Sequence, residues 1–270
     1  MKYHYFDYKK NIAGYSGEDL FSIKHILVMA IMFCILIALC ILFKKAKEKN
    51  ITVFLKVLAV FLPILEISKI TWETVWDLNT GEGFDYAGLL PLYTCSVFMF
   101  VLPFAAFGKG RAKQLALSFI TTIGIPAGLT NFVYFHILET YPIFTFPATH
   151  SLIFHFSMVF TGVFLIVTGY YRPTFKDLFC GMIPLWLFSL LVIPVNFIIY
   201  KYNPWVDYML YMRGAGMPFI GPLSEYFKSH GLLLIYSLLM ATVGYGLLNS
   251  ATVCIEQLIF KLTCKKKFSQ

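Results

Sequence analysis

Seven runs of about 20 mostly apolar residues constrain this chain more than any other feature. They cover residues 25–43, 51–71, 86–107, 115–135, 148–170, 178–200 and 231–248. A helix needs about 20 apolar residues to cross the hydrocarbon core of a bilayer. Because lipid offers no hydrogen bonds, each run must satisfy its own backbone, as a helix does. The sequence therefore predicts an all-α, polytopic membrane helix bundle with seven transmembrane helices, a multi-pass protein of the cell membrane.

The composition agrees with lipid as the solvent. The chain is 59% hydrophobic and only 13% charged, whereas soluble domains carry about 25% charged residues. Its net charge of +8 could suggest a nucleic-acid partner. The basic residues, however, lie in short segments between the apolar runs, where they act as topology signals. We therefore expect membrane phospholipids as partners and no nucleic acid.

The basic residues predict the orientation of the bundle. They follow the first, third, fifth and seventh runs, and number four, three, two and four. These residues are Lys44, Lys45, Lys47 and Lys49; Lys109, Arg111 and Lys113; Arg172 and Lys176; and Lys261, Lys265, Lys266 and Lys267. The second interval is acidic, with Asp77, Glu82 and Asp85. An excess of Lys and Arg marks the cytoplasmic side, so we expect the N-terminus outside and the C-terminus in the cytoplasm.

The chain divides into three parts on this basis. Residues 1–24 form an extracytoplasmic segment, residues 25–260 form one seven-helix membrane domain, and residues 261–270 form a basic cytoplasmic tail. The outer intervals 134–147 and 201–230 are rich in aromatic residues, which is typical of segments at the level of the lipid headgroups. The six cysteines have no CxxC or zinc-ligand spacing. We therefore expect no disulfide framework, no metal and no cofactor.

Ionisable residues within membrane spans are costly and indicate a functional site. The second run holds Glu66, Lys69 and Glu73, whose spacing of three and four residues places them on one helix face. The third run holds Cys95 and the fifth holds His155. At 1.5 Å per residue, Cys95 lies about 13 Å and His155 about 10 Å below the outer end of its run.

Four more residues complete the candidate site: Tyr93, Asn131, His150 and Asn196. The two asparagines are about 6 Å inside their runs, and the inner halves of the runs are nearly free of polar groups. This shared depth predicts one polar site that opens outward.

Each candidate also has a plain structural explanation. Glu66 and Lys69 are explained equally well as an ion pair whose charges cancel inside the bundle and as part of a functional site. A buried cysteine is commonly a small hydrophobic residue, and His155 can serve only to bond a carbonyl of a neighbouring helix. Asn196 follows Pro194 closely enough to satisfy the carbonyls that a proline leaves unbonded. In this structural explanation, the Phe-rich faces of the helices contact lipid or pack in the core.

Several short motifs, taken in their order along the chain, resemble those of a known membrane protein family. They are residues 90–95 (LPLYTC), 124–126 (GIP), 141–142 (YP), 151–155 (SLIFH), 194–196 (PVN) and 207–211 (DYMLY) followed by Pro218. With them the chain resembles the YwaF-like integral membrane protein family, relatives of the animal transmembrane protein 164 acyltransferase. Tyr93 stands where that family often has His, and Asp207 where it often has Asn. The match runs from about the second span to the seventh.

The resemblance implies a thiol-dependent phospholipid acyltransferase in which Cys95 and His155 form the catalytic pair. In such chemistry a thiolate attacks an acyl ester, while the histidine accepts and returns the proton. Glu66, Lys69, Tyr93, Asn131, His150 and Asn196 would then line the substrate site. The alternative is a non-enzymatic lipid-binding or carrier protein that uses a Glu66, Lys69 and His155 cluster. A structural partner subunit, in which Cys95 has no reaction to perform, is a third hypothesis.

Overall fold

The structure is a computed structural model that describes residues 3–8, 12, 14–17, 21–81, 90–203, 206, 208–210, 226–227 and 229–267. Within these residues all regular structure is helical. The sequence motif at 207–211 lies partly outside the described residues, as do Pro218 and the acidic residues Glu82 and Asp85. The expected all-α fold is therefore confirmed for the described part of the chain.

Eight α-helices and two short 3₁₀ helices are described. The α-helices are α1 (Ile23–Phe43), α2 (Glu48–Thr80), α4 (Ser96–Phe107), α5 (Gly110–Thr121), α6 (Gly124–Val133), α7 (Phe146–Val167), α8 (Phe175–Tyr200) and α10 (Leu233–Lys267). The 3₁₀ helices are η2 (His136–Glu139) and η3 (Tyr208–Leu210). Six segments are long and apolar enough to cross a membrane, whereas α4 is apolar but has only 12 residues. Multi-pass insertion is thus supported, and the seventh span stays a prediction.

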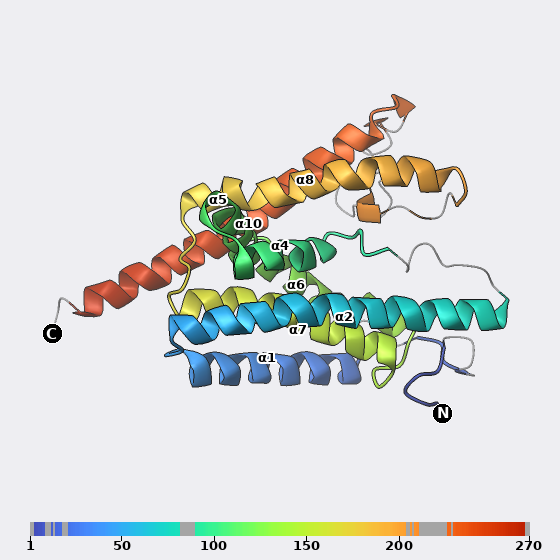
Figure 1. Ribbon diagram of the computed structural model, residues 1–270, viewed down its shortest axis with the longest axis horizontal. Coiled ribbons are helices and arrows are strands. Elements are labelled where there is room, and N and C mark those ends of the chain that lie inside the picture. The colour runs from blue at the N-terminus through green and yellow to red at the C-terminus, as the bar shows by residue number, and fades with distance from the viewer. Residues whose placement is uncertain are drawn as a thin grey trace.

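The long helices α1, α2, α7 and α8 lie lengthwise in a bundle (Figure 1). Helix α7 contacts α1, α2, α5 and α6, and α5 contacts α4, α7 and α8. Most of α5 and α6 is buried, whereas α1 is almost entirely uncovered. The uncovered side chains of α1 are large and apolar, among them Ile31, Ile35 and Leu42. A surface of this kind is suited to lipid rather than to water.

The fourth apolar run is a broken helix rather than the continuous span expected for residues 115–135. Helix α5 ends at Thr121 and α6 begins at Gly124. Pro126, in the first turn of α6, has no N–H to donate, and a first turn tolerates this loss. The hydroxyls of Thr121 and Thr122 donate to the carbonyls of Leu117 and Ser118, at 2.8 and 2.6 Å. The break is therefore compensated inside the protein.

Three other expected spans have different bounds in the structure. The seventh was expected over residues 231–248, with residues 261–270 as a separate tail, but α10 is one helix over Leu233–Lys267. The second is longer than residues 51–71, since α2 has 33 residues and ends at Gly81 in a left-handed conformation. The third was expected over residues 86–107, but residues 90–95 are not helical and α4 begins at Ser96. Pro91 favours an extended backbone at the residue before it. The depth of about 13 Å, computed for Cys95 from helical rise, is therefore wrong.

All four basic segments of the described chain meet at one end of the bundle, which we call the basic end. Residues from the α1–α2 and α7–α8 connections and from the starts of α2 and α5 line a common pocket there. Helix α10 joins them through Gln257, whose Nε2 donates to the Pro173 carbonyl at 2.9 Å. Helix α10 continues past the bundle at this end (Figure 1). This clustering agrees with a single basic face, while the compartment that it faces stays a prediction.

Candidate functional site

Cys95 lies at the start of α4, as the residue that precedes Ser96. Its thiol is partly buried and receives a hydrogen bond from Asn131 on α6, with Nδ2 to Sγ at 3.3 Å. This is the first pair of predicted site residues that the structure brings together. An amide donor fixes the position of the sulfur and stabilises negative charge on it. Position and charge are what a nucleophilic cysteine requires from its surroundings.

His155 lies on α7, which packs closely against α6. A Cβ built on Gly128 of α6 would lie 3.1 Å from the His155 carbonyl oxygen, so the backbones of the two helices are nearly in contact. Asn131 follows Gly128 by three residues and shares its helix face. The Cys95 and Asn131 pair thus lies near the stretch of α7 that contains His155.

The His155 ring has a defined tautomer. Its Nδ1 lies 2.8 Å from the carbonyl oxygen of Ser151, one turn earlier on α7. A carbonyl can only accept, so Nδ1 carries the proton and Nε2 is the basic nitrogen. The ring therefore bonds a carbonyl of its own helix, and not one of a neighbouring helix as the structural alternative supposed. In this tautomer Nε2 can accept a proton.

A separate polar cluster joins α2 to α7. Lys69 Nζ lies 3.2 Å from Glu66 Oε1 and 3.8 Å from Glu73 Oε2. His150 Nε2 lies 3.1 Å from Glu66 Oε2, at an angle that does not make a hydrogen bond. Glu66 and His150 are both buried. The histidine beside Glu66 is thus His150, whereas the carrier hypothesis placed His155 there.

Asn196 has a different role from the one that its nearby proline suggested. Its Nδ2 donates to the Tyr208 carbonyl at 2.8 Å, and its Oδ1 accepts the Tyr208 N–H at 3.0 Å. The ring of Tyr208 packs edge-on against Tyr93, with ring centroids 5.4 Å apart. Tyr93 precedes Cys95 by two residues. Asn196 therefore holds η3 beside the non-helical segment that leads into Cys95.

The N-terminal segment packs on the end of the bundle opposite the basic end. The hydroxyl of Tyr8 donates to Asp77 Oδ1 at 2.7 Å, and both residues are buried. Trp72 Nε1 donates to the Phe6 carbonyl at 3.2 Å, and the Phe146 N–H donates to the Tyr5 carbonyl at 2.8 Å. This segment lies near the end of α2 and the start of α7 (Figure 1). It therefore packs one helical turn away from His150.

Sequence reasoning missed two buried polar arrangements. Asp177 accepts hydrogen bonds from the hydroxyls of Ser118, Tyr171 and Thr174 and from the Thr174 N–H. Burial, with the bond to Asp177, raises the pKa of Tyr171 above its ordinary value. The spacing of Thr174 and Asp177 is that of a capping box, which the sequence does display.

The other missed arrangement is His25 at the start of α1. It accepts the Phe21 N–H at Nδ1, at 3.1 Å, and donates from Nε2 to the Phe132 carbonyl at 3.0 Å. Both ring nitrogens have partners within the fold, and the residue is 1% exposed. His25 thus joins α1 to the end of α6 and is a structural residue.

The predicted site residues therefore form three groups rather than one. Cys95 pairs with Asn131; Glu66 and Lys69 gather with His150; Asn196 fixes Tyr208 against Tyr93. His155 lies on α7. This helix carries His150 of the second group and packs against α6, which carries Asn131 of the first group. His155 follows His150 by five residues on α7, about 7.5 Å along the helix axis, so the second group lies near it. The arrangement offers a thiol, an amide donor, a basic imidazole and a charged cluster.

Comparison with known proteins identifies one family. The model of the TMEM164 family matches residues 20–242, which include every predicted site residue. No curated protein matches the chain. No solved structure matches it.

Proposed function

This chain belongs to the TMEM164 family, and from that premise we propose that it is a phospholipid acyltransferase with Cys95 as nucleophile and His155 as base. The observation that carries the proposal is the Asn131 hydrogen bond to the Cys95 sulfur, at 3.3 Å. A cysteine that served only as packing would gain little from an amide donor. A nucleophile gains a fixed position and a partner for its developing charge.

The reaction proceeds in two transfers. Cys95 Sγ attacks the carbonyl carbon of an acyl ester while its proton passes to His155 Nε2. The C–O bond then breaks, the leaving oxygen takes the proton from Nε2, and the acyl group is held on Cys95 as a thioester. In the second transfer an acceptor hydroxyl gives its proton to Nε2 and attacks the thioester. The C–S bond breaks and Sγ regains a proton.

Partial burial of the thiol makes the histidine necessary. An isolated thiolate is disfavoured away from water, so the proton must leave as the sulfur attacks. The tautomer fixed by Ser151 leaves Nε2 able to receive it. We propose that the ring of His155 comes within hydrogen-bonding distance of Cys95 when the ester is bound.

The remaining candidates are proposed as substrate contacts. Tyr93 flanks the thiol and is 40% exposed, so it can border the acyl chain. Asn196 positions the Tyr93 ring by holding Tyr208 against it. Lys69 supplies positive charge beside Glu66, and this ammonium is the group proposed to contact the phosphate of a lipid headgroup.

Acylation of the thiol tests the proposal. The protein in lipid nanodiscs is treated with a long-chain acyl p-nitrophenyl ester, and intact mass is followed over time. We expect one acyl group on Cys95, and none in Cys95→Ala. His155→Gln should slow acylation by a factor of about 10² to 10⁴, and Asn131→Leu by about 10².

Cys34→Ala is the matched control, because Cys34 is exposed on α1. It should acylate at the rate of the unaltered protein. Equal acylation of the Cys95→Ala variant, or an unchanged rate in His155→Gln, would overturn the proposal.

A lipid carrier is the second candidate, and two observations favour it. The α5–α6 break is a discontinuous helix of the kind found at transporter sites, and Glu66 meets His150 inside the bundle at 3.1 Å. In this case Cys95→Ala should leave the function intact, while Glu66→Gln should stop movement of a fluorescent lipid between vesicle leaflets. The two candidates thus differ in which variant is inactive.

A further inference from the structure

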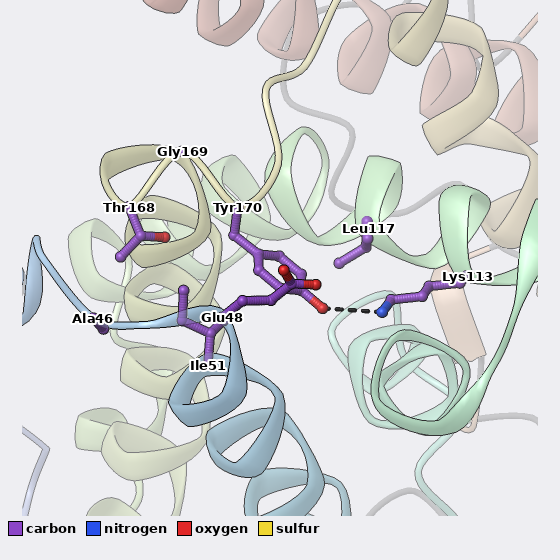
Figure 2. A pocket seen from close by; sticks show the side chains of 8 residues that line it. All are labelled: Ala46, Glu48, Ile51, Lys113, Leu117, Thr168, Gly169 and Tyr170. Atoms are coloured by element: carbon purple, nitrogen blue, oxygen red, sulfur yellow. Dashed lines mark hydrogen bonds between the residues drawn. The ribbon is translucent and has the colours of Figure 1, made fainter.

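The basic end of the bundle contains a cavity that no step of the proposed function uses. Its volume is about 390 Å³. The α1–α2 and α7–α8 connections line it together with the starts of α2 and α5. The lining residues are Ala46, Glu48 and Ile51, then Lys113 and Leu117, and then Thr168, Gly169 and Tyr170. Figure 2 shows these side chains around the pocket. Cys95 and the α2–α7 cluster lie elsewhere in the bundle, so this is a separate site.

The polar groups of the cavity suit a phosphate. Lys113 Nζ and the Tyr170 hydroxyl are 2.9 Å apart, and the two side chains point toward one another across the pocket (Figure 2). Together they present an ammonium and a hydroxyl to one place, a combination that binds phosphate oxygens well. Helix α2 also begins here, and Lys47 makes no side-chain cap. The first N–H groups of a helix have no partner within it and attract anions.

The wall that bears Tyr170 is held in place from behind. Its neighbour Tyr171 donates to buried Asp177, and the Tyr171 N–H donates to the Leu165 carbonyl at 3.2 Å. Gly169 turns the chain with a φ of +71°, a conformation that glycine adopts readily. Because these bonds do not involve the cavity, the position of Tyr170 is set before any ligand binds. Such preorganisation lowers the entropic cost of binding.

The charge around the cavity favours an anion over a neutral or cationic ligand. Lys113 is the basic residue of the lining, and the two connections that reach the cavity also carry exposed basic side chains, namely Lys44, Lys45, Lys47 and Arg172. Glu48 is the acidic residue of the lining, and its carboxylate can accept only from donors such as hydroxyl groups. An anion with hydroxyl groups fits both features. Its acyl chains can lie along the apolar faces that the neighbouring helices expose.

We propose that this pocket binds the headgroup of an anionic phospholipid that carries hydroxyl groups, with the phosphate on Lys113 and Tyr170 and a hydroxyl on Glu48. The lipid belongs to the leaflet at the basic end, which the charge pattern predicts to be cytoplasmic. The site goes beyond the proposed acyl transfer and does not depend on it. It attaches the basic end of the bundle to anionic membranes.

Native mass spectrometry of the full chain tests the site with defined lipids. Dioleoyl phosphatidylglycerol is the probe, and dioleoyl phosphatidylcholine is the reference lipid. We expect phosphatidylglycerol to be retained more tightly. Lys113→Met should weaken its retention about tenfold, the usual effect of losing a charge-assisted hydrogen bond, and Tyr170→Phe should weaken it severalfold. Lys109→Met is the matched control, since Lys109 belongs to the same basic segment but does not line the cavity, and it should stay within twofold.

Three results would overturn the proposal. One is equal retention of the two lipids, and another is retention that Lys113→Met and Tyr170→Phe both leave unchanged. The third is displacement of the lipid by millimolar inorganic phosphate, which would assign the pocket to free phosphate instead. Tyr170→Phe removes a single oxygen atom, so it remains informative if Lys113→Met disturbs folding.

Discussion

Lys69 lies between two carboxylates within a membrane helix, and these carboxylates stabilise its positive charge. Its Nζ is 3.2 Å from Glu66 and 3.8 Å from Glu73. Lys69→Met leaves both acids without this counter-charge in a largely buried place. We expect a loss of about 2 kcal/mol in the free energy of unfolding, below the usual cost of breaking a fully buried pair because these side chains are partly exposed. Thermal unfolding in detergent measures it.

The matched variant is Lys69→Arg, which keeps the positive charge and should cost much less. Adding Glu66→Gln to Lys69→Met should recover part of the lost stability, since it removes the more deeply buried acid. Equal melting temperatures for the Met and Arg variants would show that Lys69 reaches lipid headgroups instead of pairing inside the bundle.

Asn196 offers a second test at the level of single residues. Its amide satisfies both backbone groups of Tyr208, which is buried. Asn196→Leu has a similar volume but takes away the Asn196 partner of two buried backbone groups, the N–H and the carbonyl of Tyr208. Each such group costs about 1–3 kcal/mol, so we expect faster proteolysis of the segment around η3. Ser189→Ala on the same helix is the control, because it removes a hydrogen bond to the Leu185 carbonyl within α8 itself. Equal cleavage of both variants would contradict the role given to Asn196.

Polar residues within apolar runs could be picked out from the sequence, but their partners could not. Their rarity in a membrane drew attention to Glu66, Cys95 and Asn131 without any structure. Which residue faces which depends on how each helix is rotated about its axis. His150 and His155 are five residues apart, roughly 140° around a helix, so only one of them can face Glu66 closely. Sequence gives no reason to choose His150.

Among the helices, hydropathy predicted α1, α7 and α8 to within about three residues at each end. It failed at the ends of α2 and α10, which are longer than expected, and where an apolar segment is not one helix. Residues 90–95 and the α5–α6 break are as apolar as their surroundings, so the pattern predicted continuous spans. Prolines do not mark these places by themselves. Pro91 and Pro126 lie at or near them, whereas Pro63, Pro103, Pro184 and Pro194 lie inside unbroken helices.

The close packing of α7 against α5 and α6 depends on two glycines. A Cβ on Gly162 would lie 2.4 Å from Ile125 Cγ1 and 2.7 Å from the Ile120 carbonyl oxygen. A Cβ on Gly128 would lie 2.7 Å from Val159. We expect Gly162→Ala to destabilise the protein by about 1–3 kcal/mol, the usual cost of overpacking, and Gly128→Ala somewhat less because only side-chain atoms meet it below 3 Å. Thermal unfolding again provides the measurement.

Gly244→Ala and Gly246→Ala are matched controls in α10. A Cβ at either position meets nothing within 4 Å, and alanine favours a helix by up to about 1 kcal/mol relative to glycine. These variants should be neutral or stabilising. If Gly162→Ala melted at the same temperature as these controls, the close contact between α7 and α5 would not exist.

At the scale of the whole molecule, charge and packing divide the bundle into two dissimilar ends. The basic end gathers positive connections around an open cavity. The opposite end is covered by the N-terminal segment through Tyr8, Trp72 and Phe146. The proposed acyl transfer belongs to the bundle between these ends. A lipid bound at the basic end would hold the protein at a fixed depth without entering the reaction.

This asymmetry makes the orientation testable. Because the four basic segments share one end, they must all face the same compartment, and the excess of Lys and Arg predicts the cytoplasm. Reporter fusions after Lys113, Lys176 and Gln270 should therefore give cytoplasmic signals, and a fusion after Thr140 an external one; Gln270 itself lies outside the described residues. A fusion after Lys113 interrupts α5, so the intact chain provides a control. The Lys109→Cys variant is treated from outside with a membrane-impermeant thiol reagent. We expect no labelling of the introduced cysteine. A cytoplasmic signal at Thr140, or an external one at Gln270, would contradict the predicted topology and would place the lipid pocket in the outer leaflet.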